Sequence, residues 1–447
     1  MVRTRPLLLA LSVALVVATV GAGAVPTGHT AASATGSSTA VAGHGGVVAA
    51  APSDPVRSDV ATMNGSLSEE AIAASIRRVY EQPNTTSYLG VPDSQVRQSG
   101  HGQESLDVSS AVASDVERLG DSLAERSFEA SLATIEDDEK RVARMTEEVE
   151  RVEERIEALS TRQQTAIDEY NSGELTTEQF LHELLVVDAA ARQVDSRIDS
   201  LDQAGRQVPG THPIWTQLQV MRASIVPLQG TVRNRIQRAV TGDRESLTVY
   251  VVTTTDGVVL TANDDGFHYR EAYLGNKRQP NATDQFAQQG GSGVNLADER
   301  ASELYPWTYS LAKPAVAGFP DTAVYHVSAD HPHGSLDAYL DGGSQDVYRE
   351  LQTKRLDALP ITRVRENATD LLRVRVYRTH ATGPMRVTVS NPNNDEPVDA
   401  SVRVNGYEIG STGADGELWT MTPYDAVRVR AVTPGGTTVR VRFFAND

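Results

Sequence analysis

The sequence predicts a multidomain α + β protein: an antiparallel helical coiled-coil hairpin with a third helix, then an α+β domain and a small C-terminal β-sandwich. Three patterns predict this architecture. Apolar residues in two adjoining segments recur with the 3.5-residue period of a coiled-coil seam. From Ser246 the apolar period changes to two, as in β-strands. The pattern Val-Arg-Val-Arg occurs at 427–430 and again at 439–442, as half-buried antiparallel strands require.

The hairpin is predicted from Val142 to Tyr170 and from Phe180 to Leu201. Its seam positions step by three and four residues: Met145, Val149, Val152, Ile156, Leu159, Gln163, Ala166 and Tyr170, then Phe180, Leu184, Val187, Ala191, Val194, Ile198 and Leu201. Asn-Ser-Gly at 171–173 ends the first helix, because Asn and Gly suit the left-handed C-cap. Since the connection is short, the two helices are expected to pair antiparallel.

A third helix is predicted after Pro213, with a kink at Pro227 and Gly230. It carries arginines and no acidic residue, whereas residues 136–202 hold 19 acids against 8 bases. We therefore expect this helix to pack on the hairpin, with arginines meeting carboxylates.

The segment Leu106–Ile135 is also predicted to be helical, but it lies outside the strict heptads. An apolar stripe on it comprises Val112, Val116, Leu119 and Leu123. Phe128 and Ile135 fall on another phase of the helix. Because the hairpin satisfies its own seam, this segment has no obvious intramolecular partner, and it is where we predict self-association.

The α+β domain is expected at 246–370. Strands at 247–253 and 258–262 flank Asp256-Gly257, a hairpin turn signal. Further strands are expected at 323–327 and 336–340, and helices at 296–304 and 347–356. The stretch 83–104 is rich in Gly and Pro and is expected to be loop.

The N-terminus has the parts of a secretory signal: Arg3 and Arg5, an apolar run from Leu7 to Val20, and Ala22-Gly23-Ala24. An uncleaved anchor is the alternative, but the run is shorter than the ~20 residues of a membrane span. No transmembrane segment beyond the signal is predicted. The expected division is signal peptide 1–24, disordered linker 25–65, short helix and loop 66–105, helices 106–241, α+β domain 246–370 and β-sandwich 371–447. The short helix is expected to run from Ser66 to about Gln82.

The amino-acid composition limits the kinds of site and partner that the protein can have. The net charge is −18 and cysteine is absent, which excludes disulfides, thiolate nucleophiles and cysteine metal sites. The negative charge disfavours nucleic-acid binding. Arginine outnumbers lysine 37 to 4, and this acidic, lysine-poor composition resembles that of proteins from extremely halophilic archaea. Dense carboxylates keep such a surface hydrated and apart from its neighbours.

The C-terminal segment resembles the carboxypeptidase regulatory-like (transthyretin-like) domain. The matching positions are Pro397, Val398, Ala400, Val402, Val404, Gly410, Thr412, Asp415 and Gly416. The resemblance implies an immunoglobulin- or transthyretin-like β-sandwich that is accessory or adhesive and carries no catalytic residues. The whole chain resembles secreted proteins of haloarchaea.

One cluster has the residue types of a metal site: His326, Asp330, His331 and His333. Imidazoles beside a carboxylate bind zinc and similar ions, but Pro332 separates the last two histidines, and a polar turn between strands is the alternative. Four N-x-S/T triplets mark candidate glycosylation sites: Asn64, Asn84, Asn281 and Asn367.

These features predict an exported, non-enzymatic cell-surface or extracellular protein of a halophilic archaeon. Its coiled-coil spacer is expected to present β domains to an envelope protein or a glycan, and no cofactor is expected. Two alternatives remain open: an exported hydrolase with a metal-assisted site in 246–370, and an envelope-associated sensor or assembly factor.

Overall fold

The computed structural model describes residues 79–287 and 293–445. The chain divides into two units, Met1–Ser66 and Leu67–Asp447, and every described residue belongs to the second. The predicted signal peptide, the linker, Asn64 and the start of the helix expected at Ser66 lie outside the described residues. That helix was expected to continue to about Gln82, but Val79–Gln82 forms strand β1.

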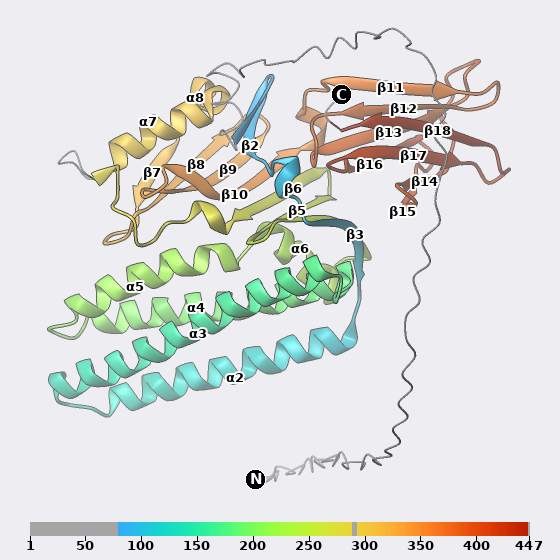
Figure 1. Cartoon of the computed structure of the whole chain (residues 1–447). Coiled ribbons are helices and arrows are strands. Elements are labelled where there is room, and N and C mark those ends of the chain that lie inside the picture. The colour runs from blue at the N-terminus through green and yellow to red at the C-terminus, as the bar shows by residue number, and fades with distance from the viewer. Residues whose placement is uncertain (1–78, 288–292, 446–447) are drawn as a thin grey trace, which may run out of the picture. The chain divides into compact units, whose positions relative to one another are not determined.

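The helical region follows the predicted seams closely (Figure 1). Its helices are α2 (Val108–Ala133), α3 (Asp138–Ser172), α4 (Thr177–Gly205), α5 (His212–Ile225) and α6 (Thr231–Val240). All seam positions predicted on α3 and α4 are buried. Gly173 adopts the left-handed conformation with φ 82° and ends α3. Thr176 and Gln179 form a capping box that begins α4.

The predicted third helix is divided at the expected kink. α5 ends at Ile225, a short 3₁₀ turn covers Val226–Leu228, and α6 begins after Gly230. On α5, Arg222 pairs with Asp199 of α4 at 2.8 Å, as the charge pattern predicts. On α6, Arg233 instead pairs with a carboxylate of the sheet.

An eight-stranded antiparallel sheet follows, in the order β3-β4-β5-β6-β10-β9-β8-β7. Its strands are β3 (Gln98–Ser105), β4 (Ser246–Thr253), β5 (Gly257–Asp264), β6 (Phe267–Leu274), β7 (Ala315–Gly318), β8 (Val324–His331), β9 (Gly334–Asp341) and β10 (Asp346–Arg355). The four strands predicted between 246 and 341 are all present. α4 and α6 pack on one face of this sheet, where Phe180 and Ile236 join one apolar core with Val249.

The other face is covered by the hairpin of β1 and β2 (Thr85–Leu89) and by α7 (Val294–Leu304) and α8 (Pro306–Leu311). Here Leu89 and Ala301 share a core with Tyr250 and Leu336. The helix predicted at 296–304 is α7. Among the described residues no helix is long and apolar enough to cross a membrane.

Two further secondary-structure predictions are wrong. The stretch 83–104, expected as loop, contains β2 and most of β3. β3 has no apolar residue, and two of its glycines admit α4: a Cβ on Gly100 would lie 2.7 Å from Thr177 Oγ1, and one on Gly102 would lie 2.8 Å from Leu181 Cδ1. The segment expected as a helix at 347–356 is the central strand β10, whose buried charged residues obscure the period of two.

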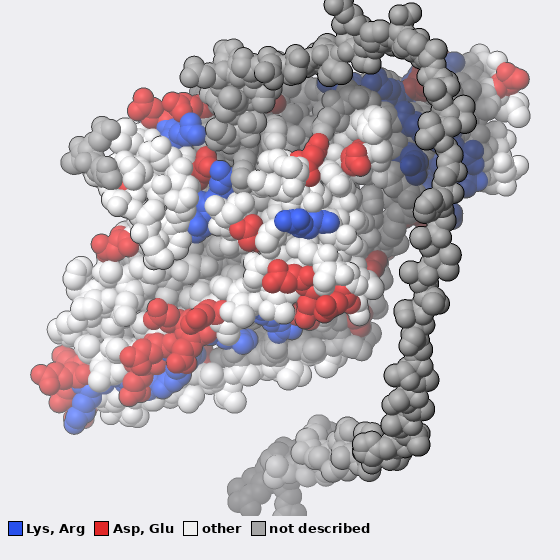
Figure 2. Space-filling view, viewed as in Figure 1, with Lys and Arg blue, Asp and Glu red and all other residues white. Residues whose placement is uncertain are grey.

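The C-terminal domain consists of two four-stranded antiparallel sheets, ordered β11-β12-β13-β16 and β15-β14-β17-β18. Its strands are β11 (Arg363–Ala368), β12 (Arg373–Arg378), β13 (Pro384–Ser390), β14 (Ser401–Val404), β15 (Tyr407–Ser411), β16 (Glu417–Met421), β17 (Ala426–Val432) and β18 (Thr438–Phe444). The valines that alternate with arginine are buried and form the core between the sheets. Its charged surface differs from that of the helical region, where Figure 2 shows acidic side chains gathered.

Candidate binding surfaces

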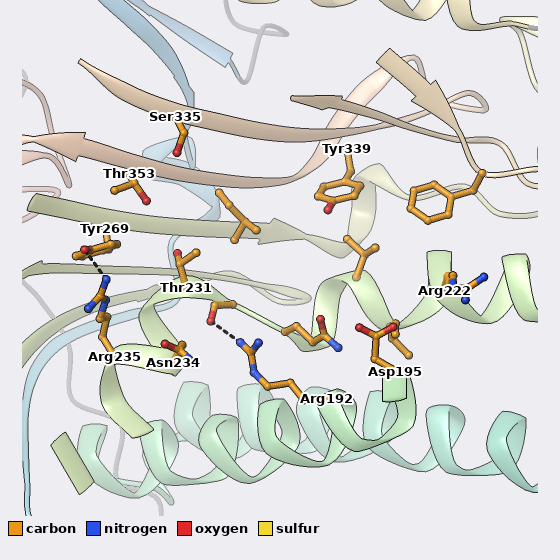
Figure 3. Close-up of a pocket in the computed structure, with 16 residues that line it drawn as sticks. Arg192, Asp195, Arg222, Thr231, Asn234, Arg235, Tyr269, Ser335, Tyr339 and Thr353 are labelled. Atoms are coloured by element: carbon orange, nitrogen blue, oxygen red, sulfur yellow. Dashed lines mark hydrogen bonds between the residues drawn. The ribbon is translucent and has the colours of Figure 1, made fainter. Parts of the chain in front are cut away.

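A cleft of about 740 Å³ lies between the helical region and the large sheet (Figure 3). Strands form its upper wall in Figure 3, and α4, α5 and α6 form its lower wall. The volume is that of a site for a small ligand.

Hydroxyl groups line the wall that the sheet provides. Thr353 of β10 lies opposite Ser335 of β9 on one side and opposite Tyr269 of β6 on the other. Tyr339 lies further along β9 and shares its face with Ser335, because alternate residues of a strand point the same way. These four side chains point toward the helices (Figure 3).

The helices contribute charged and amide side chains to the other wall. Arg235 of α6 donates a 2.6 Å hydrogen bond to the Tyr269 hydroxyl, and its guanidinium carbon lies 4.3 Å from the centre of that ring. Thr231 Oγ1 is shielded from solvent and has no hydrogen-bond partner in the described part of the chain. Burial and the neighbouring charge of Asp199 raise the pKa of Asp195. The wall therefore offers both donors and acceptors, as a site for a polar ligand requires.

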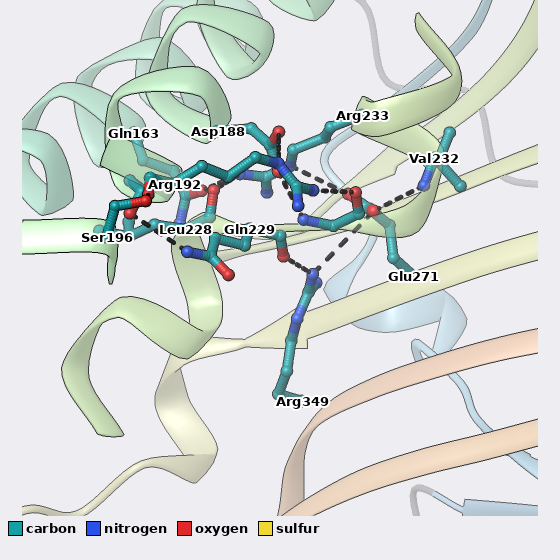
Figure 4. Close-up of polar contacts among 12 residues, drawn as sticks. Gln163, Asp188, Arg192, Ser196, Leu228, Gln229, Val232, Arg233, Glu271 and Arg349 are labelled. Atoms are coloured by element: carbon teal, nitrogen blue, oxygen red, sulfur yellow. Dashed lines mark hydrogen bonds and ion pairs between the residues drawn. The ribbon is translucent and has the colours of Figure 1, made fainter. Parts of the chain in front are cut away.

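A buried ionic network lies behind the cleft and holds α6 on the sheet (Figure 4). Arg233 donates to Glu271 Oε1 at 2.9 Å, to Gln163 Oε1 at 2.8 Å and to the Leu228 carbonyl at 2.8 Å. Arg349 of β10 lies 4.0 Å from the other oxygen of Glu271. Both arginines and the carboxylate are shielded from solvent.

Two carboxylates cap the N-terminus of α6, which has no cap from its own side chain because its N-cap residue is Gly230. Glu271 Oε2 accepts from the Val232 amide at 3.0 Å. Asp188 accepts from the Gly230 amide at 2.7 Å and also binds Arg192. Carboxylates suit this end of a helix because of its positive dipole. Burying charges of this kind adds little net stability, so we interpret the network as fixing the position of the wall.

A second buried cluster lies on the opposite face of the sheet. Glu350 accepts from Arg270 at 3.0 Å, from the Tyr305 hydroxyl at 2.7 Å and from the Leu89 amide at 2.8 Å. Burial lowers the pKa of the neighbouring Lys354 to about 7. Neither cluster was predicted from the sequence. The available signal was the repeat Tyr-Arg-Glu, which occurs at 269–271 and again at 348–350.

The four predicted metal residues are not brought together as one set, although His331 and His333 are neighbours with ring centres 6.3 Å apart. His326 lies on the face with Tyr339, stacks on that ring with centres 4.5 Å apart, and hydrogen-bonds Asp337 at 2.8 Å. His331 and His333 contact Trp307 of α8, on the other face of the sheet. Asp330 is exposed. Within 79–287 and 293–445, no group of three His, Cys, Asp or Glu side chains has the arrangement of a metal site.

The described sequons differ in the exposure and hydrogen bonding of their asparagine side chains. Asn84 is exposed in the turn between β1 and β2, with φ 58°. Asn281 is exposed in the loop before α7. Asn367 is exposed on β11, but its side-chain amide donates a 2.8 Å hydrogen bond to the Arg440 carbonyl.

An apolar line is exposed on α2. Val112, Val116, Leu119 and Leu123 are 55%, 63%, 70% and 70% exposed. The C-terminal part of the same helix is anchored, because Phe128 is buried beneath the guanidinium groups of Arg144 and Arg197. We call these four exposed residues the α2 line.

Together these features define a protein with a helical region, a large antiparallel sheet and a C-terminal domain of two packed antiparallel sheets. The chain belongs to the family described as Domain of unknown function (DUF7096), whose model matches residues 1–245. Residues 249–360 match the Family of unknown function (DUF7094), and residues 363–440 match the archaeal fibronectin-III type-like domain. No curated protein and no solved structure matches the chain. The resemblance to the carboxypeptidase regulatory-like domain stays a prediction.

Proposed function

We propose that this protein is an exported, non-enzymatic interaction protein of the cell surface of a halophilic archaeon, and that it self-associates through α2. Its helical hairpin acts as a coiled-coil spacer that presents the β domains to the surroundings. The observation that carries the proposal is the α2 line, because contiguous exposed apolar surface marks interaction sites. The predicted signal and the acidic composition support export and a saline habitat.

The partner that the α2 line fits is a second copy of this chain. Its members are separated by four, three and four residues, so they form one seam along the helix. A seam of this spacing fits a copy of itself, and two-fold pairing is the commonest arrangement of identical chains. Two helices that pair over three to four turns bury on the order of 1,000 Å², near the lower limit of specific interfaces. We therefore expect a reversible dimer.

The dependence of binding on salt concentration distinguishes a second copy of this chain from a basic partner. α2 carries five acidic residues and two arginines between Val108 and Ala133, so two copies repel each other at low ionic strength. At molar salt the Debye length falls to ~3 Å, which removes most of this repulsion. Dimerisation through α2 should therefore strengthen as KCl rises, whereas binding of a basic partner should weaken.

Sedimentation equilibrium of the purified chain at low and molar KCl tests the proposal. Replacing a seam leucine by a charged residue removes, from each copy, on the order of 1.5–3 kcal/mol of the free energy that apolar burial contributes to dimerisation. Leu119→Glu should therefore lower the dimerisation constant at least tenfold. Leu371→Glu is the matched control, since Leu371 is also 70% exposed. A chain that is monomeric at every salt concentration, or a dimer that Leu119→Glu leaves intact, would overturn the proposal.

A further inference from the structure

Five arginines share the outer face of the C-terminal sheet formed by β14, β17 and β18. They are Arg403, Arg428, Arg430, Arg440 and Arg442, which we call the arginine face. Arg430 lies directly opposite Arg403 on one side and Arg440 on the other. Arg428 lies directly opposite Arg442. Like charges in directly opposed positions destabilise a sheet, so this arrangement weakens the domain that carries it.

Carboxylates neutralise little of this face. Glu408 pairs with Arg403 at 2.6 Å. Among the described residues, no ion pair reaches the other four arginines. The outer face of the opposite sheet differs, because its arginines have carboxylate partners: Arg375 pairs with Glu366 at 2.6 Å and Arg386 pairs with Glu417 at 3.4 Å. The same domain therefore neutralises one face and leaves the other cationic, although the chain as a whole has a net charge of −18.

The geometry favours an extended anion over a compact one. Neighbouring strands lie ~4.8 Å apart, and alternate residues along a strand lie ~6.7 Å apart, so the arginines form a grid. Between them is a shallow hollow of about 200 Å³, lined otherwise by Gly406 and Val429. The strand separation is comparable to the length of one sugar residue. A polymer with an acidic group on each sugar can therefore meet successive arginines of the row Arg403, Arg430 and Arg440.

We propose that the arginine face binds an acidic polysaccharide through its carboxylate or sulfate groups. The planar guanidinium fork binds such groups with two parallel hydrogen bonds. At molar salt only charges in contact still interact, so these paired contacts carry the binding. The proposal names the chemistry of a partner for the β domains, and it does not depend on pairing through α2.

Calorimetric titration of the full chain tests this proposal. The probes are heparin, which is sulfated, and polygalacturonate, which is carboxylated; neutral dextran, poly-glutamate and a single-stranded oligonucleotide are the comparisons. At least one of the two acidic polysaccharides should bind at least tenfold more tightly than all three comparisons. Binding of neither polysaccharide, or equally tight binding of poly-glutamate or the oligonucleotide, would overturn the proposal.

Variants place the site on the arginine face. Replacing both Arg430→Gln and Arg440→Gln should weaken polysaccharide binding at least tenfold. The same change at Arg375 and Arg386, on the opposite sheet, should leave binding within about twofold. Because the first pair removes opposed charges, its melting temperature should not fall, which separates lost binding from lost folding. Equal loss of binding in the two double variants would overturn the proposal.

Discussion

The guanidinium of Arg233 donates a 2.9 Å hydrogen bond to the carboxylate of Glu271, with both side chains shielded from water. This contact joins α6 to β6, one of the two middle strands of the large sheet. The other oxygen of Glu271 accepts from the amide of Val232 at the start of α6. One carboxylate therefore orients the helix, neutralises an arginine and fixes one wall of the cleft.

Removing the Glu271 carboxylate should destabilise the protein strongly. Glu271→Ala leaves the charges of Arg233 and Arg349 buried without their partner, which costs ~3–5 kcal/mol in comparable buried pairs. Urea unfolding measures the loss. The control is Glu366→Ala, which removes a half-exposed carboxylate from Arg375 and should cost under ~1 kcal/mol. A loss no larger than that of the control would show that the network is not needed for stability.

Gly230→Ala should destabilise the protein because the added methyl group has no room. Its φ is −160°, which any residue adopts, but a Cβ there would lie 1.8 Å from Glu271 Oε2. Moving the carboxylate costs ~1–3 kcal/mol, as overpacking does. Gly120 of α2 is the control, because its Cβ would meet nothing within 4 Å. Gly120→Ala should gain ~0.5–1 kcal/mol from helix propensity. Equal effects of the two changes on urea unfolding would contradict this explanation.

Lys354 should make stability depend on pH above neutrality. Burial lowers its pKa from 10.5 to about 7 in the folded protein. Between these values the unfolded chain binds more protons than the folded one, so the free energy of unfolding should rise with pH in this window. Lys354→Met should raise stability at pH 7 and flatten the rise toward pH 10. Urea unfolding at both values measures this, and a slope that the substitution leaves unchanged would exclude Lys354 as its cause.

Glycosylation tests the proposed export. Asn84 and Asn281 are exposed, so we expect both to be modified in protein recovered from native cells. Asn367 should be modified less, because its amide donates to the Arg440 carbonyl. Mass spectrometry of glycopeptides measures the occupancy. Unmodified Asn84 and Asn281 in cells that glycosylate other surface proteins would count against export.

The helical region could be predicted from the sequence because the spacing of apolar residues along each helix is enough to identify it. The seam residues of α3 and α4 recur at fixed spacing and are all buried. β17 and β18 could be predicted in the same way, because their alternation of Val and Arg indicates both a strand and its buried face. β3 and β10 could not be predicted in this way. β3 pairs through its backbone and contains glycines that admit Thr177 and Leu181, and β10 buries Arg349 and Glu350 on opposite faces.

The cleft is harder to predict than any single element. Ser335, Thr353 and Tyr269 become neighbours only through the register of three strands. Thr231 reaches the cleft only because the buried network places α6 on the sheet. Spacing along the chain contains neither relation. His326 and His331 lie on opposite faces of β8 because they are five residues apart on one strand, whose successive side chains alternate between the faces.

Site-specific crosslinking tests pairing through the α2 line most directly. The chain has no cysteine, so Val116→Cys and Leu119→Cys each introduce a single thiol at the middle of the line. A disulfide requires Cα atoms within about 7 Å. We expect disulfide-linked dimers on mild oxidation at molar KCl. They should form within one variant if the paired helices are parallel, or in a mixture of the two variants if they are antiparallel. Crosslinking no greater than that of Leu371→Cys in all three samples would contradict it.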